Sequence, residues 1–158
     1  MCGRTDVRIA LGQHLLAEVY QHASQCYPAE CCGFIRASGR VHRAVNDQDR
    51  LHRDDPIGFP RDSRNAYAFS PRDLLILNDA LFSSDPPVVI YHSHPDVGAY
   101  FSEYDAKIAV HDGRLIYDVD FLVIDTCKNG TRGAKLFRYV SNRFDCIWCK
   151  AAVATPES

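Results

Sequence analysis

Apolar and polar residues follow two different periods along this chain, and together these periods predict alternating helices and strands. Apolar positions at helical spacing predict three amphipathic helices, over residues 10–25, 70–83 and 102–111. Apolar, β-branched runs predict strands over residues 87–91, 119–125 and 134–140, the last after an Asn129-Gly130 turn. Residues 31–45 predict two more strands, joined by a turn at Ser38-Gly39.

Strands interleaved with helices favour an α/β fold, and we expect a single three-layer domain with a mixed, curved β-sheet flanked by helices. Residues 1–145 are assigned to this domain and residues 146–158 to a C-terminal tail. Residues 46–65 are polar and charged, which predicts a long loop insertion. Two interpretations of this loop stay open: a segment that contacts substrate or closes over a site, and a disordered insertion facing solvent.

Composition and charge exclude several classes of protein. A chain of 158 residues with 46% hydrophobic residues can bury one sizeable core. A net charge of −2 does not favour nonspecific nucleic-acid binding or a polybasic membrane surface. The apolar runs are too short for a transmembrane helix, and the first residues lack the apolar stretch of a secretory signal. We therefore expect a cytoplasmic protein whose seven cysteines are mostly thiols.

The most informative motif is His92-Ser93-His94-Pro95, which directly follows the predicted strand 87–91. Side chains alternate along a strand, so His92 and His94 are expected on the same face. Eleven residues after His94, Asp105 lies in the first turn of a helix predicted to start at Ser102. A catalytic zinc ion needs three protein ligands and an open position for water. The spacing therefore predicts a hydrolytic zinc site.

A structural interpretation competes with this one, because Ser-x-x-Asp before an apolar run is also a helix capping box. The chain contains a second copy, Ser70-Pro71-Arg72-Asp73, which has no histidine beside it in the sequence. That copy is interpreted as a cap alone, with proline at the first helical position. Taken by themselves, Ser102 and Asp105 would be structural too. Their combination with His92-x-His94 on a strand favours the metal site.

Glu30 lies upstream, after the turn-forming Pro28 and before the first predicted strand. Hydrolysis of an amide requires a proton to move from water to the leaving amine, and a glutamate that is not a metal ligand commonly carries it. On composition alone, Glu30 would be interpreted as a surface residue. The downstream motif is what makes it a candidate general base.

Glu30, His92-x-His94-Pro95 and Ser102-x-x-Asp105 together resemble the JAMM metalloproteases, the catalytic branch of the MPN domain superfamily. The similarity spans roughly the first 140 residues and points to the compact prokaryotic members. Members of the family more often have proline where this chain has Phe101, a difference in the loop rather than in the motif. The resemblance implies an MPN-type fold, whose layers are similar to those of cytidine deaminases.

Carried over to this chain, the resemblance implies one zinc ion held by His92, His94 and Asp105. It implies that Glu30 is general base and then acid, and that Ser102 donates a hydrogen bond to the oxyanion. The implied reaction is hydrolysis of an amide bond at the C-terminal Gly-Gly tail of a ubiquitin-like or sulfur-carrier protein. Whether that bond is a peptide or an isopeptide bond stays open, and so does the oligomeric state.

Two other functions were weighed. A non-catalytic MPN-type scaffold in a larger assembly is the main alternative, although such relatives lose motif residues that this chain keeps. A zinc deaminase needs His-x-Glu followed by Pro-Cys-x-x-Cys. Here His92 is followed by Ser93-His94, and Cys146 is preceded by Asp145, so the deaminase pattern fails in both halves.

The remaining cysteines and histidines carry weaker signals. Cys31 and Cys32 are expected to pack on opposite faces of a strand. Cys146-Ile147-Trp148-Cys149 lacks the second pair that a four-ligand zinc site requires, although a regulatory disulfide stays open. Surface or capping positions are predicted for the histidines outside the motif, which are His14, His22, His42, His52 and His111.

Overall fold

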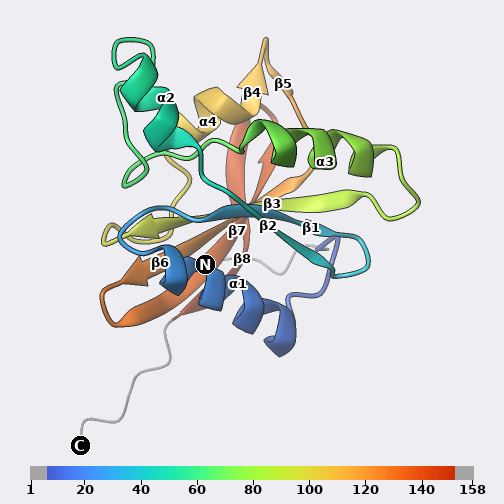
Figure 1. Ribbon diagram of the computed structural model, residues 1–158. Coiled ribbons are helices and arrows are strands. Elements are labelled where there is room, and N and C mark those ends of the chain that lie inside the picture. The colour runs from blue at the N-terminus through green and yellow to red at the C-terminus, as the bar shows by residue number, and fades with distance from the viewer. Residues whose placement is uncertain (1–6, 152–158) are drawn as a thin grey trace, which may run out of the picture.

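Six strands form one mixed sheet at the centre of the computed structural model, which describes residues 7–151 (Figure 1). In spatial order they are β2 (Val41–Ala44), β1 (Cys32–Arg36), β3 (Pro87–Pro95), β6 (Asp120–Cys127), β7 (Gly130–Val140) and β8 (Arg143–Ala151). The pair β3 and β6 is parallel, and the other neighbouring pairs of this sheet are antiparallel. The predicted mixed sheet is confirmed.

Helices cover both faces of the sheet. Helix α1 (Gln13–Cys26) lies on one face, and α2 (Gln48–Asp54), α3 (Pro71–Leu81) and α4 (Glu103–Ala109) lie on the other (Figure 1). After α4, the short strands β4 (Val110–His111) and β5 (Arg114–Leu115) form a separate hairpin. The predicted three-layer α/β arrangement is therefore confirmed. Within residues 7–151, no helix combines the length and the hydropathy needed to cross a bilayer.

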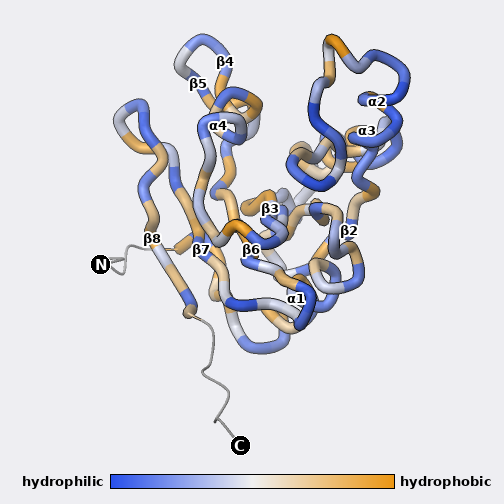
Figure 2. The backbone as a smooth tube through the Cα atoms, turned by 90° about the vertical axis from the view of Figure 1, so that its left-hand side faces the viewer, coloured by the Kyte–Doolittle hydropathy of each residue, from blue (hydrophilic) through white to orange (hydrophobic). Residues whose placement is uncertain are grey.

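Alternation along β3 separates the core into two apolar clusters. Val89 and Tyr91 pack on the α1 side, whereas Ile90 packs on the side of α3 and α4. The adjacent residues Cys31 and Cys32 are also divided between the two clusters, as predicted. In Figure 2, hydrophobic colouring is concentrated on the central strands and hydrophilic colouring on the segment around α2. The even-numbered positions of β3 consequently face α2, α3 and α4.

The segment 46–65 differs from its prediction, because it contains α2 and is bound to the domain. Asn46 Nδ2 donates to the carbonyl oxygen of Glu30 at 3.0 Å. Ser63 Oγ and the Asp49 carboxylate are 2.8 Å apart. The interpretation as a disordered insertion is therefore wrong. Helix α2 was missed because its buried residue is Gln48, so the segment carries no apolar period that would reveal a helix.

Three further predictions need correction. Strand β8 includes residues 146–151, so the tail predicted over 146–158 is an edge strand in its first part, while residues 152–158 lie outside the described range. The helix predicted over 102–111 ends at Ala109, where the chain turns into the β4–β5 hairpin. His22 is buried rather than exposed, and its Nδ1 is 2.7 Å from the hydroxyl of Tyr91. Position 22 lies on the sheet-facing side of α1, so a histidine there needs a polar partner.

Candidate metal centre

Strand β3 delivers two imidazole rings to one buried point. The Nε2 atoms of His92 and His94 are 3.1 Å apart, and the side chains are 0% and 6% exposed. Their shared face follows from the period of two along a strand. The strand is held on both sides, since Cys32 of β1 and Val123 of β6 pair with His92. The predicted placement of both histidines is confirmed.

The first turn of α4 places the carboxylate of Asp105 beside the two imidazole rings. Asp105 Oδ2 lies 3.2 Å from the Nε2 atoms of both histidines. The same oxygen accepts the backbone N–H of Ser102 at 3.0 Å, and Ser102 Oγ accepts the backbone N–H of Asp105 at 3.0 Å. This reciprocal capping box fixes the first turn of α4 and aims Asp105 at the histidines. The cap interpretation is therefore confirmed, and the same cap places the Asp105 carboxylate beside the two histidines.

A hydrogen bond to the loop after β3 determines which nitrogen of His94 carries the proton. His94 Nδ1 is 3.1 Å from the carbonyl oxygen of Gly98, and a carbonyl can only accept. Nδ1 therefore carries a proton, and in the neutral ring the lone pair lies on Nε2, the atom that faces Asp105 and can bind a metal ion. A positive charge between Nε2 and the Asp105 carboxylate, carried by a metal ion or by a proton on Nε2, stabilises this arrangement. The donor set fits a cation, and the His94–Gly98 bond is typical of a histidine that binds metal.

Glu30 completes the cluster from the segment that precedes β1. Its carboxylate and the ring nitrogens of His92 and His94 all lie within 4.8 Å of one another, and Glu30 is 3% exposed. The backbone N–H of Glu30 donates to the carbonyl of Ser63 at 2.7 Å, which ties this segment to the chain after α2. Glu30, His92 and His94 have the donor atoms to hold a metal ion.

Burial sets the protonation of these groups when no cation is bound. Burial, with help from the Asp105 carboxylate, raises the pKa of Glu30 to about 9, and the positive charge of Arg61 opposes this. Burial lowers the pKa of His92 more strongly than Asp105 raises it. Burial also raises the pKa of Asp105, but the two histidines and the Ser102 N–H hold it below its ordinary value. These shifts favour an ionised Asp105 and a protonated Glu30 when no cation is bound.

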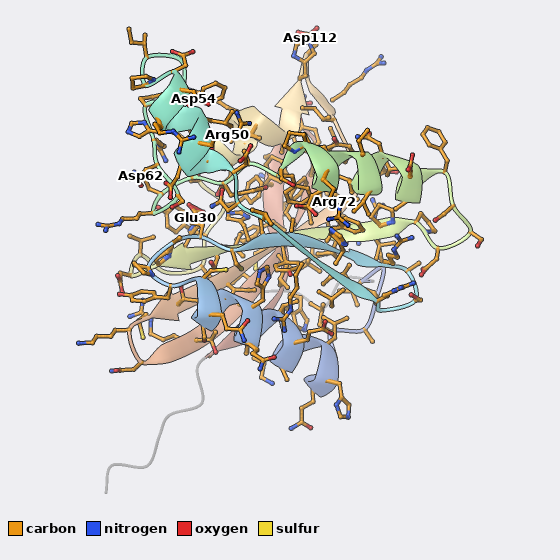
Figure 3. All side chains as sticks on the ribbon, in the orientation of Figure 1. Glu30, Arg50, Asp54, Asp62, Arg72 and Asp112 are labelled. Atoms are coloured by element: carbon orange, nitrogen blue, oxygen red, sulfur yellow. The ribbon has the colours of Figure 1, made fainter. Side chains whose placement is uncertain are left out.

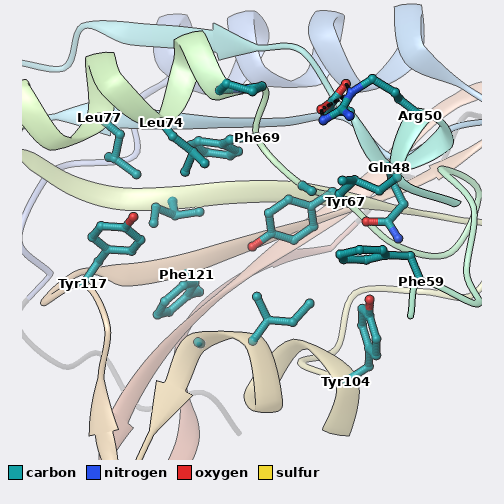
Figure 4. A pocket seen from close by; sticks show the side chains of 17 residues that line it. Gln48, Arg50, Phe59, Tyr67, Phe69, Leu74, Leu77, Tyr104, Tyr117 and Phe121 are labelled. Atoms are coloured by element: carbon teal, nitrogen blue, oxygen red, sulfur yellow. Dashed lines mark hydrogen bonds and ion pairs between the residues drawn. The ribbon is translucent and has the colours of Figure 1, made fainter. Parts of the chain in front are cut away.

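An apolar cavity of about 420 Å³ adjoins the cluster (Figure 4). Tyr67 lines this cavity and stacks on His92 with ring centroids 4.6 Å apart, so the ring separates the cavity from the candidate metal ligand His92. His92 Nδ1 is buried without a hydrogen-bond partner among the described residues, and stacking rather than hydrogen bonding supports that ring. The cavity has the size and lining of a site for an apolar group.

The structure brings all five predicted site residues together and adds others that sequence reasoning missed. Gly98 and Tyr67 were missed because one acts through its backbone carbonyl and the other lies in a segment without regular period. Neither Cys146 nor Cys149 belongs to the cluster; both lie on β8. Among the described residues, the histidines outside the motif are absent from it as well.

Comparison with known proteins agrees with this geometry. The model of the family described as prokaryotic homologs of the JAB domain matches residues 12–138. A solved structure from Desulfitobacterium hafniense is 22% identical with a TM-score of 0.57, and the match covers 85% of this chain and 86% of that one. A second, from Salinibacter ruber, is 18% identical with a TM-score of 0.52, covering 93% and 92%. These two show a shared fold, and the search of curated proteins gave no match. Because the family model spans most of the chain, this protein belongs to the prokaryotic homologs of the JAB domain.

Proposed function

We propose that this protein is a zinc-dependent metallopeptidase or isopeptidase that hydrolyses an amide bond. The observation that carries the proposal is the triangle formed by His92 Nε2, His94 Nε2 and Asp105 Oδ2, with edges of 3.1 to 3.2 Å. Ligands of tetrahedral zinc, at bond lengths of about 2.0 to 2.1 Å, are separated by about 3.3 Å. These three residues are the proposed zinc ligands, which leaves Glu30 for proton transfer.

Zinc, when bound, supplies Lewis acidity that polarises the scissile carbonyl and makes a water molecule acidic. Glu30 accepts a proton as the water oxygen bonds to the carbonyl carbon, and returns it to the nitrogen as the C–N bond breaks. The products are a carboxylate and a free amine. The hydroxyl of Ser102 has no acceptor among the described residues, because Ser102 Oγ only accepts the Asp105 N–H. Its proton is therefore available to the oxyanion.

We further propose that the substrate is the C-terminal Gly-Gly tail of a ubiquitin-like or sulfur-carrier protein. The support is the match in motif type and spacing to the JAMM metalloproteases, together with the apolar cavity beside His92, which suits an apolar residue of such a tail. A cytoplasmic location is part of the same proposal. Its support is the burial of Cys31 and Cys32 as thiols in apolar clusters, which suits a reducing compartment.

The first test is the metal content of protein purified without added metal, followed by tail cleavage on sulfur-carrier fusions with and without chelator. We expect about one zinc per chain and cleavage that chelation abolishes. Glu30→Gln should keep the zinc and lower turnover by about 10²- to 10⁴-fold. Near-normal turnover in that variant would assign the general base elsewhere. Failure to bind zinc even when it is added would make the protein a scaffold.

A further inference from the structure

Arg61 lies at the edge of the metal centre on a segment that is fixed in place at several points. The carbonyl of Arg61 accepts the side-chain amide of Gln48 at 2.9 Å. Two residues later, the carbonyl of Ser63 accepts the backbone N–H of Glu30 at 2.7 Å. In Figure 3, Glu30 and Asp62, the residue after Arg61, lie together beneath α2. The backbone that carries Arg61 is therefore bound directly to the backbone that carries Glu30.

The Arg61 guanidinium extends toward the start of α4. Its Cζ lies 4.1 Å from the ring centroid of Tyr104, the residue that immediately precedes Asp105. Figure 4 shows Tyr104 at the same end of the cavity as Gln48 and Phe59. The positive charge of the guanidinium opposes the rise in the Glu30 pKa that burial causes. Arg61 thus spans the gap between the Glu30 segment and the Asp105 helix.

No carboxylate of the described residues forms an ion pair with this half-buried guanidinium. One of its five N–H groups donates to the carbonyl of Asn65 at 3.1 Å. Arginines away from full solvent exposure are commonly paired, and elsewhere in this chain Arg138 binds Asp120 in that way. The guanidinium fork of Arg61 keeps donors for an anion that the chain itself does not supply.

The position of Arg61 relative to Glu30 indicates which part of the substrate that anion belongs to. Under the proposed function, Glu30 returns a proton to the leaving nitrogen, so the leaving residue must lie against Glu30. We propose that Arg61 binds a carboxylate of the residue released by hydrolysis. A released residue with a free α-carboxylate is the last residue of its chain. The enzyme would then preferentially trim a C-terminal residue and disfavour an isopeptide bond to an internal lysine, which carries no carboxylate at that place.

A purely structural role for Arg61 makes a different prediction. A cation–π contact that only braces α4 would affect stability, and would affect every substrate to the same extent. The preference for one substrate over another, rather than the rate itself, therefore distinguishes the two roles.

The test uses zinc-loaded protein and three dansyl-labelled peptides that differ only at the C-terminus. One ends in Gly-Gly-Ala with a free carboxylate, the second is the same peptide as a C-terminal amide, and the third ends in Gly-Gly-Asp amide. We expect kcat/KM for the free acid to exceed that for the Ala amide by about ten- to a hundredfold. Arg61→Gln should bring this ratio close to one, and Arg61→Lys should restore part of it. Arg64→Gln, an exposed arginine of the same segment, is the matched control and should leave the ratio unchanged.

A second measurement needs no turnover. The anisotropy of the dansyl fluorescence reports how tightly each peptide binds to zinc-loaded Glu30→Gln protein. The free acid should bind more tightly than the Ala amide, and Arg61→Gln in this background should remove the difference. Equal binding and equal cleavage of acid and amide would overturn the assignment of Arg61 and leave the proposed hydrolase standing. Tighter binding of the acid without any cleavage would support Arg61 and count against the proposed function. A preference for the Asp amide equal to that for the free acid would show that the site accepts a side-chain carboxylate as well as a chain end, and would overturn the preference for trimming a C-terminal residue.

Discussion

Two helices of this protein begin with the same Ser-x-x-Asp pattern, yet of these two only α4 borders the candidate metal centre. Asp73 and Asp105 are equally buried, each 6% exposed, and each follows a serine that caps its helix. The difference lies in what faces the carboxylates. Hydrogen-bond donors surround Asp73, whereas Asp105 faces two histidine nitrogens that can both bind a metal ion.

At α3, both oxygens of the Asp73 carboxylate have hydrogen-bond partners within the protein. The Ser70 hydroxyl donates to Asp73 Oδ2 at 2.6 Å, and the Val45 N–H donates to the same oxygen at 2.8 Å. His42 Nε2 is 2.8 Å from Oδ1. At α4, by contrast, Asp105 Oδ2 lies 3.2 Å from the Nε2 atoms of His92 and His94, both of which can bind a metal ion. An identical local pattern therefore yields a complete hydrogen-bond network in one place and part of a candidate metal site in the other.

Replacing each of the two aspartates by alanine tests this comparison with the largest expected effect. Asp105→Ala should lower zinc from about one per chain to near zero, and hydrolysis with it, because two histidines alone leave the ligand set incomplete. Asp73→Ala should keep the zinc but lose stability, by about 1 to 3 kcal/mol for each donor left unpaired. Elemental analysis and thermal unfolding of both variants measure the two effects. Normal zinc occupancy in Asp105→Ala would remove that residue from the ligand set.

Substitution of the two capping serines, Ser70 and Ser102, is a second matched pair with smaller expected effects. Ser70→Ala and Ser102→Ala should each cost about 1 kcal/mol, because each removes a helix cap. Only Ser102→Ala should also lower kcat, by about 10²- to 10³-fold, since the Ser70 proton is already donated to Asp73 while that of Ser102 is available to the oxyanion. Urea unfolding and steady-state kinetics separate these outcomes. An unchanged kcat in Ser102→Ala would reduce that serine to a cap.

The smallest expected effect is a pH dependence of the stability that Asp73 contributes at the start of α3. Burial raises the pKa of Asp73, but Ser70, Val45 and His42 together hold it below its ordinary value of 3.8. A depressed carboxyl pKa contributes stability that is present above the unfolded pKa and is lost as the pH falls through the folded one. Asp73→Asn should therefore be less stable by on the order of 1 kcal/mol at pH 7, with a difference that shrinks below pH 3.8.

Urea unfolding of Asp73→Asn at pH 7 and pH 3 checks this expectation. Asp79→Asn, at an exposed position of the same helix, serves as its control and should follow the wild-type protein at both values. A constant difference between wild type and Asp73→Asn across this range would mean that the charge of Asp73 does not contribute.

Much of the fold and the site could be predicted because the patterns behind them are local. The period of two placed His92 and His94 on one face, and helical spacing located α1 and α3 to within a few residues. Helix α2, strand β8 and the burial of His22 could not be predicted in this way. Each depends on a partner distant in the sequence: Gln48 bonds to Arg61, β8 pairs with β7, and His22 bonds to Tyr91.

The sequence by itself determined which chemical groups were available and on which face of each element they lie, because rise and rotation per residue depend only on the local backbone. The capping pattern by itself could not distinguish Asp105 from Asp73, since both caps satisfy the same local rule, and only the nearby His92-x-His94 motif favoured Asp105. The tertiary structure made that distinction by placing β3 beneath α4 and Glu30 beside both, and by turning the Gly98 carbonyl toward His94. The chemistry of the site depends on distances between segments, and packing of the whole sheet and its helices sets those distances.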